Sequence, residues 1–347
     1  MKNPFRQLFA KPEAPPAGPL AADGQLASDL WIDRPDAAER LAGMRSRGEV
    51  TAEEADRLRH FIERGYLTFS LGALEAEAQA LADDVERVWR DKPADLAYAW
   101  QGPLRSFAYA DRTRDRRPSY RIADLHSHSE SALALYLNPA IFRMIELALG
   151  SPAVATQSLA FEWGSQQGLH RDPVFVQTQP PSHLIAAWIA LEDVDPESGP
   201  LVYVPGSHRL PYYQFEPGQF LFDQSRYGPN EAEAMAAFDR ARCAAAGLEA
   251  EPLLCPRGTV LLWHSSLLHG GSAVVDPTKT RKSFVVHFST AERYRLRRQG
   301  IEEYLPGEDG QTVPRHRILE TEEILERPGA RGFASPMAGY TPPGSRT

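Results

Sequence analysis

The stretch "HLIAAWIALEDVDPESGPLVYV", residues 183–204, decides the fold class of this chain. It holds two apolar runs, "HLIAAWIAL" and "PLVYV", on either side of the turn-forming segment "DPESGP". Runs of this length and composition, bounded by Pro, Gly, Asp and Ser, are typical of β-strands joined by a turn. No helical pattern lies between them, as a parallel crossover would require. The stretch therefore predicts antiparallel strands.

Further strands are predicted on both sides of this pair. They are "AVATQSLAFEW" at 153–163, "TVLLWH" at 259–264 and "KSFVVHFS" at 282–289. Strands thus follow one another from about 153 to 290 without a helix after each one. This order favours an antiparallel sandwich or barrel over a doubly wound parallel sheet. We expect a mainly β protein with flanking helices.

Helical patterns precede the strands. Thr51 and Glu54 form the pattern of a capping box, and Gly65 follows the apolar stripe as a typical helix end. Two more helices are predicted at roughly 73–90 and 138–149, the latter with Pro at its start and Gly just past its end.

We predict a single domain over residues 46–327 between two tails. The Ala-, Pro- and Gly-rich start of the chain indicates a largely flexible segment. The predicted parts are an N-terminal tail (1–45), helices (50–150), a β core (151–292), a helix inserted in that core (about 229–248) and a C-terminal tail (328–347).

Composition narrows the class of protein. The 347 residues include 42% hydrophobic and 10% aromatic residues, enough for a large core, and the net charge of −8 disfavours a general nucleic-acid binder. The two cysteines, Cys243 and Cys255, are too few for a disulfide framework and suit a reducing compartment. We see neither a signal peptide nor a membrane span, so we expect a soluble, cytoplasmic protein.

Metal-ligand residue types recur at two strand ends. In "GLHRDPVF", residues 168–175, His170 and Asp172 point the same way if the backbone is extended. A third ligand is offered by "TVLLWHSSLLHGGS", where Gly270 and Gly271 after His269 permit a turn that most residues could not make. His264 in the same segment is the alternative.

These pieces resemble the phytanoyl-CoA dioxygenase family of Fe(II)/2-oxoglutarate oxygenases. "HRD" at 170, "HGG" at 269 and "RKSFVVHF" at 281 are similar to its motifs, as are "AAWIALEDVDPESGPLVYVPGSHR" and "ERGYLTF". The resemblance covers about residues 48–292, with all five pieces in the family's order. It implies a double-stranded β-helix core, the jelly-roll or cupin-like fold.

The resemblance also implies the cofactors. His170, Asp172 and His269 would bind Fe(II), because two imidazoles and one carboxylate on one face leave positions open for other ligands. In the family, 2-oxoglutarate and O₂ take those positions, and 2-oxoglutarate is oxidised to succinate and CO₂. The far carboxylate of 2-oxoglutarate needs a buried cation, and the resemblance gives this role to Arg281.

Other residues are assigned to the cosubstrate by the same resemblance. Trp188 flanks it, and Ser283 lies on the strand face of Arg281 by the period-two rule. Thr156 is a lining residue on the preceding strand, with Gln157 as its competitor. Arg121, in "YRIAD", matches a family segment in which a basic residue reaches the cosubstrate. The alternative is simple core packing for Trp188 and a core hydroxyl bonded to the backbone for Ser283.

The remaining histidines are not expected to bind the metal. His208, in "VPGSHR", is expected to be structural, and His287 to be a satisfied core histidine. His126 and His128 have the spacing of a metal pair but lack a third ligand. Arg171 stands where the family often has an amide or another polar residue, so its role is open.

Two segments have no firm assignment. Residues 105–121 contain six arginines and two aspartates, which would suit either an anionic substrate or a solvated loop. Residues 212–250 follow the substrate side of the fold in relatives, where we expect a lid, a wall or an oligomer contact.

The sequence favours an iron- and 2-oxoglutarate-dependent hydroxylase that acts on a small organic substrate, with an anionic one as an option. Asp172 fills the position that halogenating relatives leave open, which disfavours halogenation. Desaturation, epimerisation and cyclisation stay open. So does a non-catalytic jelly-roll binding protein, whereas a zinc hydrolase would leave Arg281 without a carboxylate.

Overall fold

The structure is a computed structural model of the whole chain. It describes residues 28–293 apart from gaps at 71, 73–74, 93–95, 101–105, 110–119, 176–177, 179 and 223–225, together with residue 24 and the segments 304–306, 312–314, 324–327 and 330–333.

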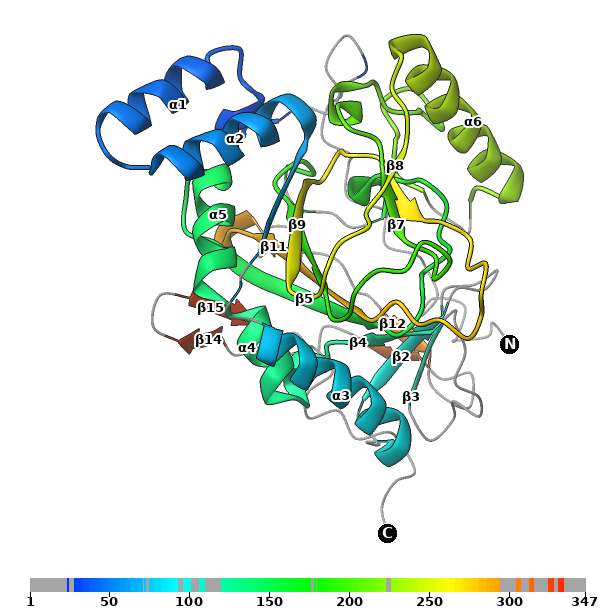
Figure 1. Cartoon of the computed structure of the whole chain (residues 1–347). Coiled ribbons are helices and arrows are strands. Elements are labelled where there is room, and N and C mark those ends of the chain that lie inside the picture. Colours follow the sequence, from blue (N-terminus) through cyan, green and yellow to red (C-terminus); the bar gives the residue numbers. More distant parts are fainter. Residues whose placement is uncertain are drawn as a thin grey trace, which may run out of the picture.

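One large antiparallel sheet forms the centre of the molecule (Figure 1). The strand pair expected on either side of "DPESGP" is split between this sheet and a smaller one. In order across the large sheet, its strands are β1 (Tyr66–Ser70), β9 (Thr259–His264), β6 (Ile185–Ala190), β11 (Ser283–Ser289), β5 (Val154–Phe161), β4 (Tyr120–Ala123), β2 (Ala97–Trp100) and β3 (Ser106–Tyr109).

A small second sheet faces the first. Its strands are β10 (His269–Gly271), β7 (Leu201–Tyr203) and β8 (Glu251–Pro252), all antiparallel. Side chains from both sheets share one apolar cluster, which includes Trp188 and Trp263 from the large sheet and Leu201 and Tyr203 from the small one. The expected mainly antiparallel jelly roll with flanking helices is confirmed.

Alternation along β11 separates the two sides of the large sheet. Phe284, Val286 and Phe288 belong to the core shared with the helices, whereas Val285 belongs to the cluster between the sheets. Because successive strand side chains point to opposite faces, Ser283 and His287 lie on the same side as Val285. The near-continuous apolar pattern of this strand reflects burial on both faces.

The outer face of the large sheet is covered by helices α2 (Ala52–Arg64), α3 (Glu75–Asp91), α4 (Glu130–Tyr136) and α5 (Pro139–Leu149). The expected capping box is present, since Thr51 Oγ1 accepts from the Glu54 amide at 3.1 Å and Glu54 accepts from the Thr51 amide at 2.8 Å. Gly65 ends α2 with φ +79° and Gly150 ends α5 with φ +73°, the left-handed region that favours glycine. The inserted helix is α6 (Pro229–Ala246).

The prediction of a flexible N-terminal tail is wrong for residues 28–45. A short 3₁₀ turn η2 (Trp31–Asp33) and helix α1 (Ala37–Ser46) pack on the protein. Leu30, Trp31 and Ile32 are buried, and Trp31 Nε1 donates to the Leu147 carbonyl at 2.9 Å. Burial of three consecutive apolar residues stabilises this segment. Residues 1–23 and 25–27 lie outside the described part of the chain.

Two further boundaries differ from the sequence prediction. The region expected to be helical, 50–150, also contributes strands β1 to β4 to the large sheet. In the expected C-terminal tail, β15 (Ala330–Phe333) pairs with β14 (Ile324–Arg327), and Gly332 pairs with Ala155 of β5. These segments form strands because they pair with distant strands, and such pairing cannot be recognised from the local sequence.

Among the residues that the structure describes, one stretch is long and apolar enough to cross a membrane, Glu130–Leu149. It consists of two helices, α4 and α5, which are separated at Leu137 and Asn138. Most of it is buried inside the protein, as is typical of core helices.

Candidate metal centre

Three potential ligands converge between the two sheets. His170, Asp172 and His269 each offer a ligand atom, and these atoms all lie within 4.8 Å of one another. The Nε2 atom of His269 lies 3.6 Å from Oδ1 of Asp172, and the rings of the two histidines are 4.4 Å apart between centroids. In the described part of the chain this is the one such group of three.

Backbone pairing brings the distant ligands together. The amide of His170 donates to the carbonyl of His269 at 2.9 Å, and the reverse hydrogen bond is 3.0 Å long. Asp172 is fixed to the same segment, because its amide donates to the Ser265 carbonyl at 3.1 Å. The two ligand segments thus form a short ladder.

Gly270 and Gly271 serve a different purpose from the one expected. They continue strand β10 and do not adopt a left-handed turn. A Cβ atom on Gly270 would lie 2.6 Å from the carbonyl oxygen of Gln167, and one on Gly271 would lie 2.5 Å from Oγ of Ser165. The glycines are needed because the two ligand-bearing segments approach so closely.

Both imidazoles are oriented by backbone carbonyls. Nδ1 of His170 lies 2.9 Å from the Gly168 carbonyl oxygen, and Nδ1 of His269 lies 3.0 Å from that of Leu267. A carbonyl only accepts, so each Nδ1 carries a hydrogen, and in the neutral form of each ring Nε2 has the lone pair that a metal would take. Metal-binding histidines are commonly fixed in this way.

Asp172 is held by two residues that the sequence analysis missed as site residues. Trp263 Nε1 donates to Oδ2 of the carboxylate at 2.8 Å, and Nε2 of His287 lies 3.9 Å from the same oxygen. Burial raises the pKa of Asp172, but His269, His287 and His170 together with the Trp263 hydrogen bond bring that pKa below its ordinary value. The carboxylate is therefore ionised, as a metal ligand must be.

A second group of buried polar atoms lies deeper between the sheets. Nε of Arg281, Nε1 of Trp188 and Oγ of Ser283 are all buried and have no hydrogen-bond partner among the described residues. The Arg281 guanidinium lies 5.6 Å from the Trp188 ring centroid, and Arg281 and Ser283 are two positions apart. Burial lowers the pKa of Arg281 to about 10, so it stays cationic at neutral pH.

Unpartnered buried donors are rare and call for an explanation. Three convergent donors, one of them a cation, fit the carboxylate of a bound molecule. The residues thus fit both groups implied by the motifs, a divalent metal at the three ligands and a dicarboxylate beside Arg281.

Arg121 and Thr156, the other two residues assigned to the cosubstrate, lie in different surroundings. The Arg121 guanidinium lies 5.6 Å from the Phe161 ring centroid, and Arg281 contacts the same ring at 5.9 Å. Thr156 instead donates its hydroxyl to the His287 carbonyl at 3.0 Å, at a break in the register between β5 and β11. Its competitor Gln157 lies 3.0 Å from Nδ1 of His287 through Nε2, so Gln157 is the residue connected to the metal centre.

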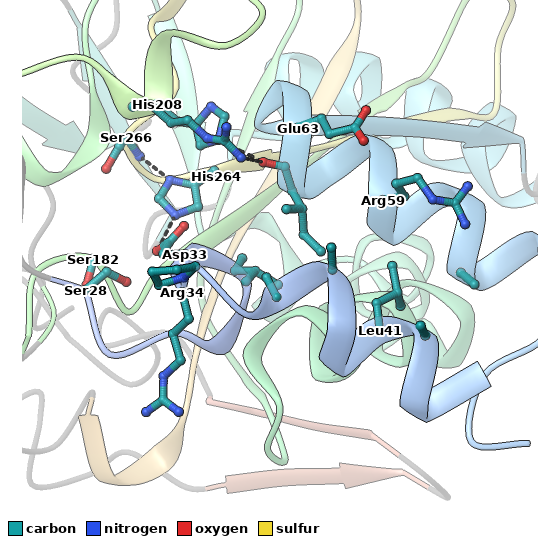
Figure 2. A pocket seen from close by; sticks show the side chains of 18 of the residues that line it. Ser28, Asp33, Arg34, Leu41, Arg59, Glu63, Ser182, His208, His264 and Ser266 are labelled. Atoms are coloured by element: carbon teal, nitrogen blue, oxygen red, sulfur yellow. Dashed lines mark hydrogen bonds and ion pairs between the residues drawn. The ribbon is translucent and has the colours of Figure 1, made fainter. Parts of the chain in front are cut away.

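His264, the alternative third ligand, faces elsewhere. Its Nε2 lies 3.2 Å from Asp33 Oδ2, and its Nδ1 accepts from the Ser266 amide at 3.0 Å. Both nitrogens are occupied, and the ring borders a separate cavity of about 1180 Å³ between the N-terminal helices and the jelly roll (Figure 2). His208 lines the same cavity, where its Nε2 lies 3.3 Å from the Ile62 carbonyl.

The other predictions have mixed outcomes. Nδ1 of His126 lies 2.7 Å from Oγ of Ser158, and the His126 ring stacks on Tyr136, which is a structural role. His287 is buried as expected, but it also borders Asp172. Most of the arginine-rich segment, at 105 and 110–119, lies outside the described residues.

The fold and the site together define a class. A jelly roll with two histidines and one carboxylate on one face is the arrangement typical of non-haem iron proteins with open coordination positions. The model of the family "Phytanoyl-CoA dioxygenase (PhyH)" matches residues 51–282. The chain belongs to the phytanoyl-CoA dioxygenase family, as its motifs predicted.

Individual relatives are distant. Mouse phytanoyl-CoA dioxygenase domain-containing protein 1 is 25% identical over 171 residues, 48% of this chain and 55% of that protein. Bovine peroxisomal phytanoyl-CoA dioxygenase is 23% identical over 245 residues, 66% of each chain. The chain therefore spans between about half and two thirds of the length of these relatives.

A solved structure supports the fold. That of the non-haem alpha-ketoglutarate-dependent carbocyclase SnoK from nogalamycin biosynthesis matches with a TM-score of 0.53 at 20% identity. The match covers 70% of this chain and 86% of that chain.

Proposed function

We propose that the protein is an Fe(II)- and 2-oxoglutarate-dependent dioxygenase that hydroxylates a small organic substrate. The observation that carries this proposal is the pairing of two sites in one jelly roll. His170, Asp172 and His269 form one cluster between the sheets. Arg281, just before strand β11, is buried, and its Nε has no hydrogen-bond partner among the described residues. Family membership gives independent support.

The three ligands would hold Fe(II) through Nε2 of both histidines and one Asp172 oxygen. When bound, iron and 2-oxoglutarate supply the oxidising chemistry, in which 2-oxoglutarate and O₂ give succinate and CO₂ while one oxygen atom reaches the substrate. The role of the protein is then to fix the ligands. Trp263 contributes by donating a hydrogen bond to Oδ2 of Asp172, which orients the carboxylate.

Arg281 would bind the far carboxylate of 2-oxoglutarate, with Ser283 and Trp188 as further donors. This assignment follows from their unsatisfied state, because a carboxylate would supply acceptors for buried donors. The aromatic rings of Trp188 and Phe161 border the guanidinium, exclude water and so strengthen this ion pair. Arg121 is a further proposed contact, next to the same Phe161 ring.

The proposal extends to location and substrate. Both cysteines are free, which suits the cytoplasm. The substrate would be a small molecule, and an anionic group on it is an option that the arginines of 105–121 suggest.

The experiment is turnover under ¹⁸O₂. The full-length protein with Fe(II) and 2-oxoglutarate should release succinate that carries one atom of ¹⁸O, and a true substrate among candidate metabolites should increase that release. A hydroxylated product containing ¹⁸O would establish the reaction. Folded, iron-loaded protein that forms no labelled succinate with any metabolite would favour a non-catalytic binding protein instead.

A further inference from the structure

Arg171, which lies between the proposed ligands His170 and Asp172, is one of the largest fully buried side chains of the protein. Its ligand neighbours point toward the metal centre, so Arg171 points to the opposite side of the extended segment. There Nη1 donates to the carbonyls of Leu210 at 2.9 Å and Pro211 at 3.1 Å, and Nη2 donates to Oδ1 of Asp239 at 3.1 Å. Both terminal nitrogens of the guanidinium thus have acceptors, whereas Nε has none among the described residues.

Asp239 comes from the inserted helix α6. The buried residues of α6 are Met235, Asp239 and Cys243, which lie four positions apart and therefore share one face. Most of the remaining surface of the helix is exposed. These three residues form the stripe that α6 buries fully, and the half-buried Phe238 adds a ring contact with Tyr213 at 5.7 Å.

Each residue of that stripe either pairs with a neighbour of a proposed metal ligand or shares an apolar cluster with one. Asp239 pairs with Arg171, which lies between His170 and Asp172. Met235 belongs to the same apolar cluster as Val174, two positions after Asp172. Cys243 packs in a small cluster with Leu268, which directly precedes His269. One helix thus supports both ligand-bearing segments.

Tyr212 reinforces the connection between these segments. Its ring lies 4.5 Å from the Arg171 guanidinium, and its hydroxyl donates to Oγ of Ser266 at 2.8 Å. Ser266 belongs to the turn that leads to His269. The contacts therefore connect His170 and Asp172, through Tyr212 at the start of the 212–250 segment, with the segment that carries His269.

We propose that α6 is a brace for the metal centre, with Arg171 and Asp239 as positioning residues that fix the spacing of the three ligands. A lid would need a surface free to move over the substrate, whereas the contacts of α6 join it to the backbone behind the ligands. The brace rests on the proposed metal site, whose ligands it would position.

A role in stability alone explains the ion pair poorly. Moving two charges out of water costs about as much as their attraction returns, so a buried pair is weak support for stability. In line with this cost, burial raises the pKa of Asp239 although Arg171 lowers it. The pair instead fixes the orientation of the Arg171 side chain, because three acceptors hold its planar guanidinium in one position.

The experiment compares metal binding by full-length apoprotein variants, with Co(II) as the spectroscopic probe. Asp239→Ala should weaken Co(II) binding about 10- to 100-fold, the usual loss when a residue that orients metal ligands is removed. It should also change the visible spectrum of the bound ion, because the ligand geometry relaxes. Asp239→Asn, which keeps an oxygen that can accept from Arg171, should lose only about 3- to 10-fold.

Glu233→Gln is the matched control. Glu233 lies on the exposed side of α6 and pairs with Arg240 at 2.6 Å, so this variant should bind Co(II) like the wild type. Thermal unfolding of each apoprotein reports stability separately. A purely structural role would lower the unfolding temperature of Asp239→Ala but leave its Co(II) affinity and spectrum unchanged.

The outcomes separate the two proposals. If the wild type binds no Co(II), the metal site itself is wrong. If the wild type binds and folded Asp239→Ala stays within about twofold of it, the brace is wrong and the metal site stands. Should Asp239→Ala fail to fold, Asp239→Asn decides by the same criterion, and unchanged affinity there overturns the brace.

Discussion

The two ends of the candidate site are built in opposite ways. At the metal end, Nδ1 of both histidines and one carboxylate oxygen of Asp172 have protein partners. At the Arg281 end, three buried donors have none among the described residues. The difference teaches that contacts within the protein orient the proposed metal ligands, whereas at the deeper, Arg281 end the protein leaves its donors unsatisfied, which is why we propose that 2-oxoglutarate binds there.

The largest expected effect is at the metal end. Asp172→Ala removes a ligand and should lower Fe(II) affinity by more than about 100-fold, beyond the range seen for residues that only orient ligands. Succinate formation should fall with it, while circular dichroism shows an intact fold. His264→Gln is the control, because both nitrogens of His264 have other partners, and it should keep its iron. Loss of iron in His264→Gln alone would reverse the ligand assignment.

A change at the Arg281 end should affect the binding of 2-oxoglutarate and not that of Fe(II). Arg281→Met should weaken 2-oxoglutarate binding about 10- to 150-fold, the value of charged hydrogen bonds, and leave Fe(II) affinity nearly unchanged. Because the variant also removes a buried cation without a hydrogen-bonded partner, the apoprotein should unfold at an equal or higher temperature. Calorimetry of unfolding and of 2-oxoglutarate binding measures both effects. Marked destabilisation would mean that Arg281 is satisfied within the protein.

Trp263→Phe tests whether the metal end is pre-oriented. The change removes the hydrogen bond to Asp172 and keeps most of the ring, so Fe(II) affinity should fall about 10- to 100-fold. Affinity of the iron-loaded protein for 2-oxoglutarate should change little. Anaerobic iron titration gives the first value, and an affinity equal to that of the wild type would show that the carboxylate needs no partner.

The smallest effect is expected for Ser283→Ala. The hydroxyl is a neutral donor in the deeper end, so 2-oxoglutarate should bind about 2- to 13-fold more weakly. Iron affinity and unfolding temperature should not change, because no described residue uses this hydroxyl. Competition with succinate measures the shift. A stabilised or destabilised apoprotein would indicate a role in packing instead.

The sequence predicted the parts of the site that depend on local spacing. His170 and Asp172 are two apart on an extended segment, and Arg281 and Ser283 follow the same alternation. Alternation along β9 and β11 could also have placed Trp263 and His287 on the same face of the sheet as Trp188. Their apolar surroundings favoured a core interpretation, because a buried residue and a site residue give the same pattern.

Other features depend on contacts between distant segments. A register break between β5 and β11 decides that Gln157, and not Thr156, contacts the His287 ring. The segment around Trp31 looked flexible by composition, yet its indole binds the distant Leu147 carbonyl. The link between Arg171 and Asp239 joins residues 68 positions apart, which no local pattern indicates.

The most direct test of the central claim is an anaerobic titration of 2-oxoglutarate into Fe(II)-loaded protein, followed by visible absorption. A metal-to-ligand charge-transfer band should develop with saturation at one equivalent in the wild type, and should require much more 2-oxoglutarate in Arg281→Met. If folded, iron-loaded wild type develops no band, or if both proteins saturate alike, then iron and 2-oxoglutarate do not meet in this site as we propose.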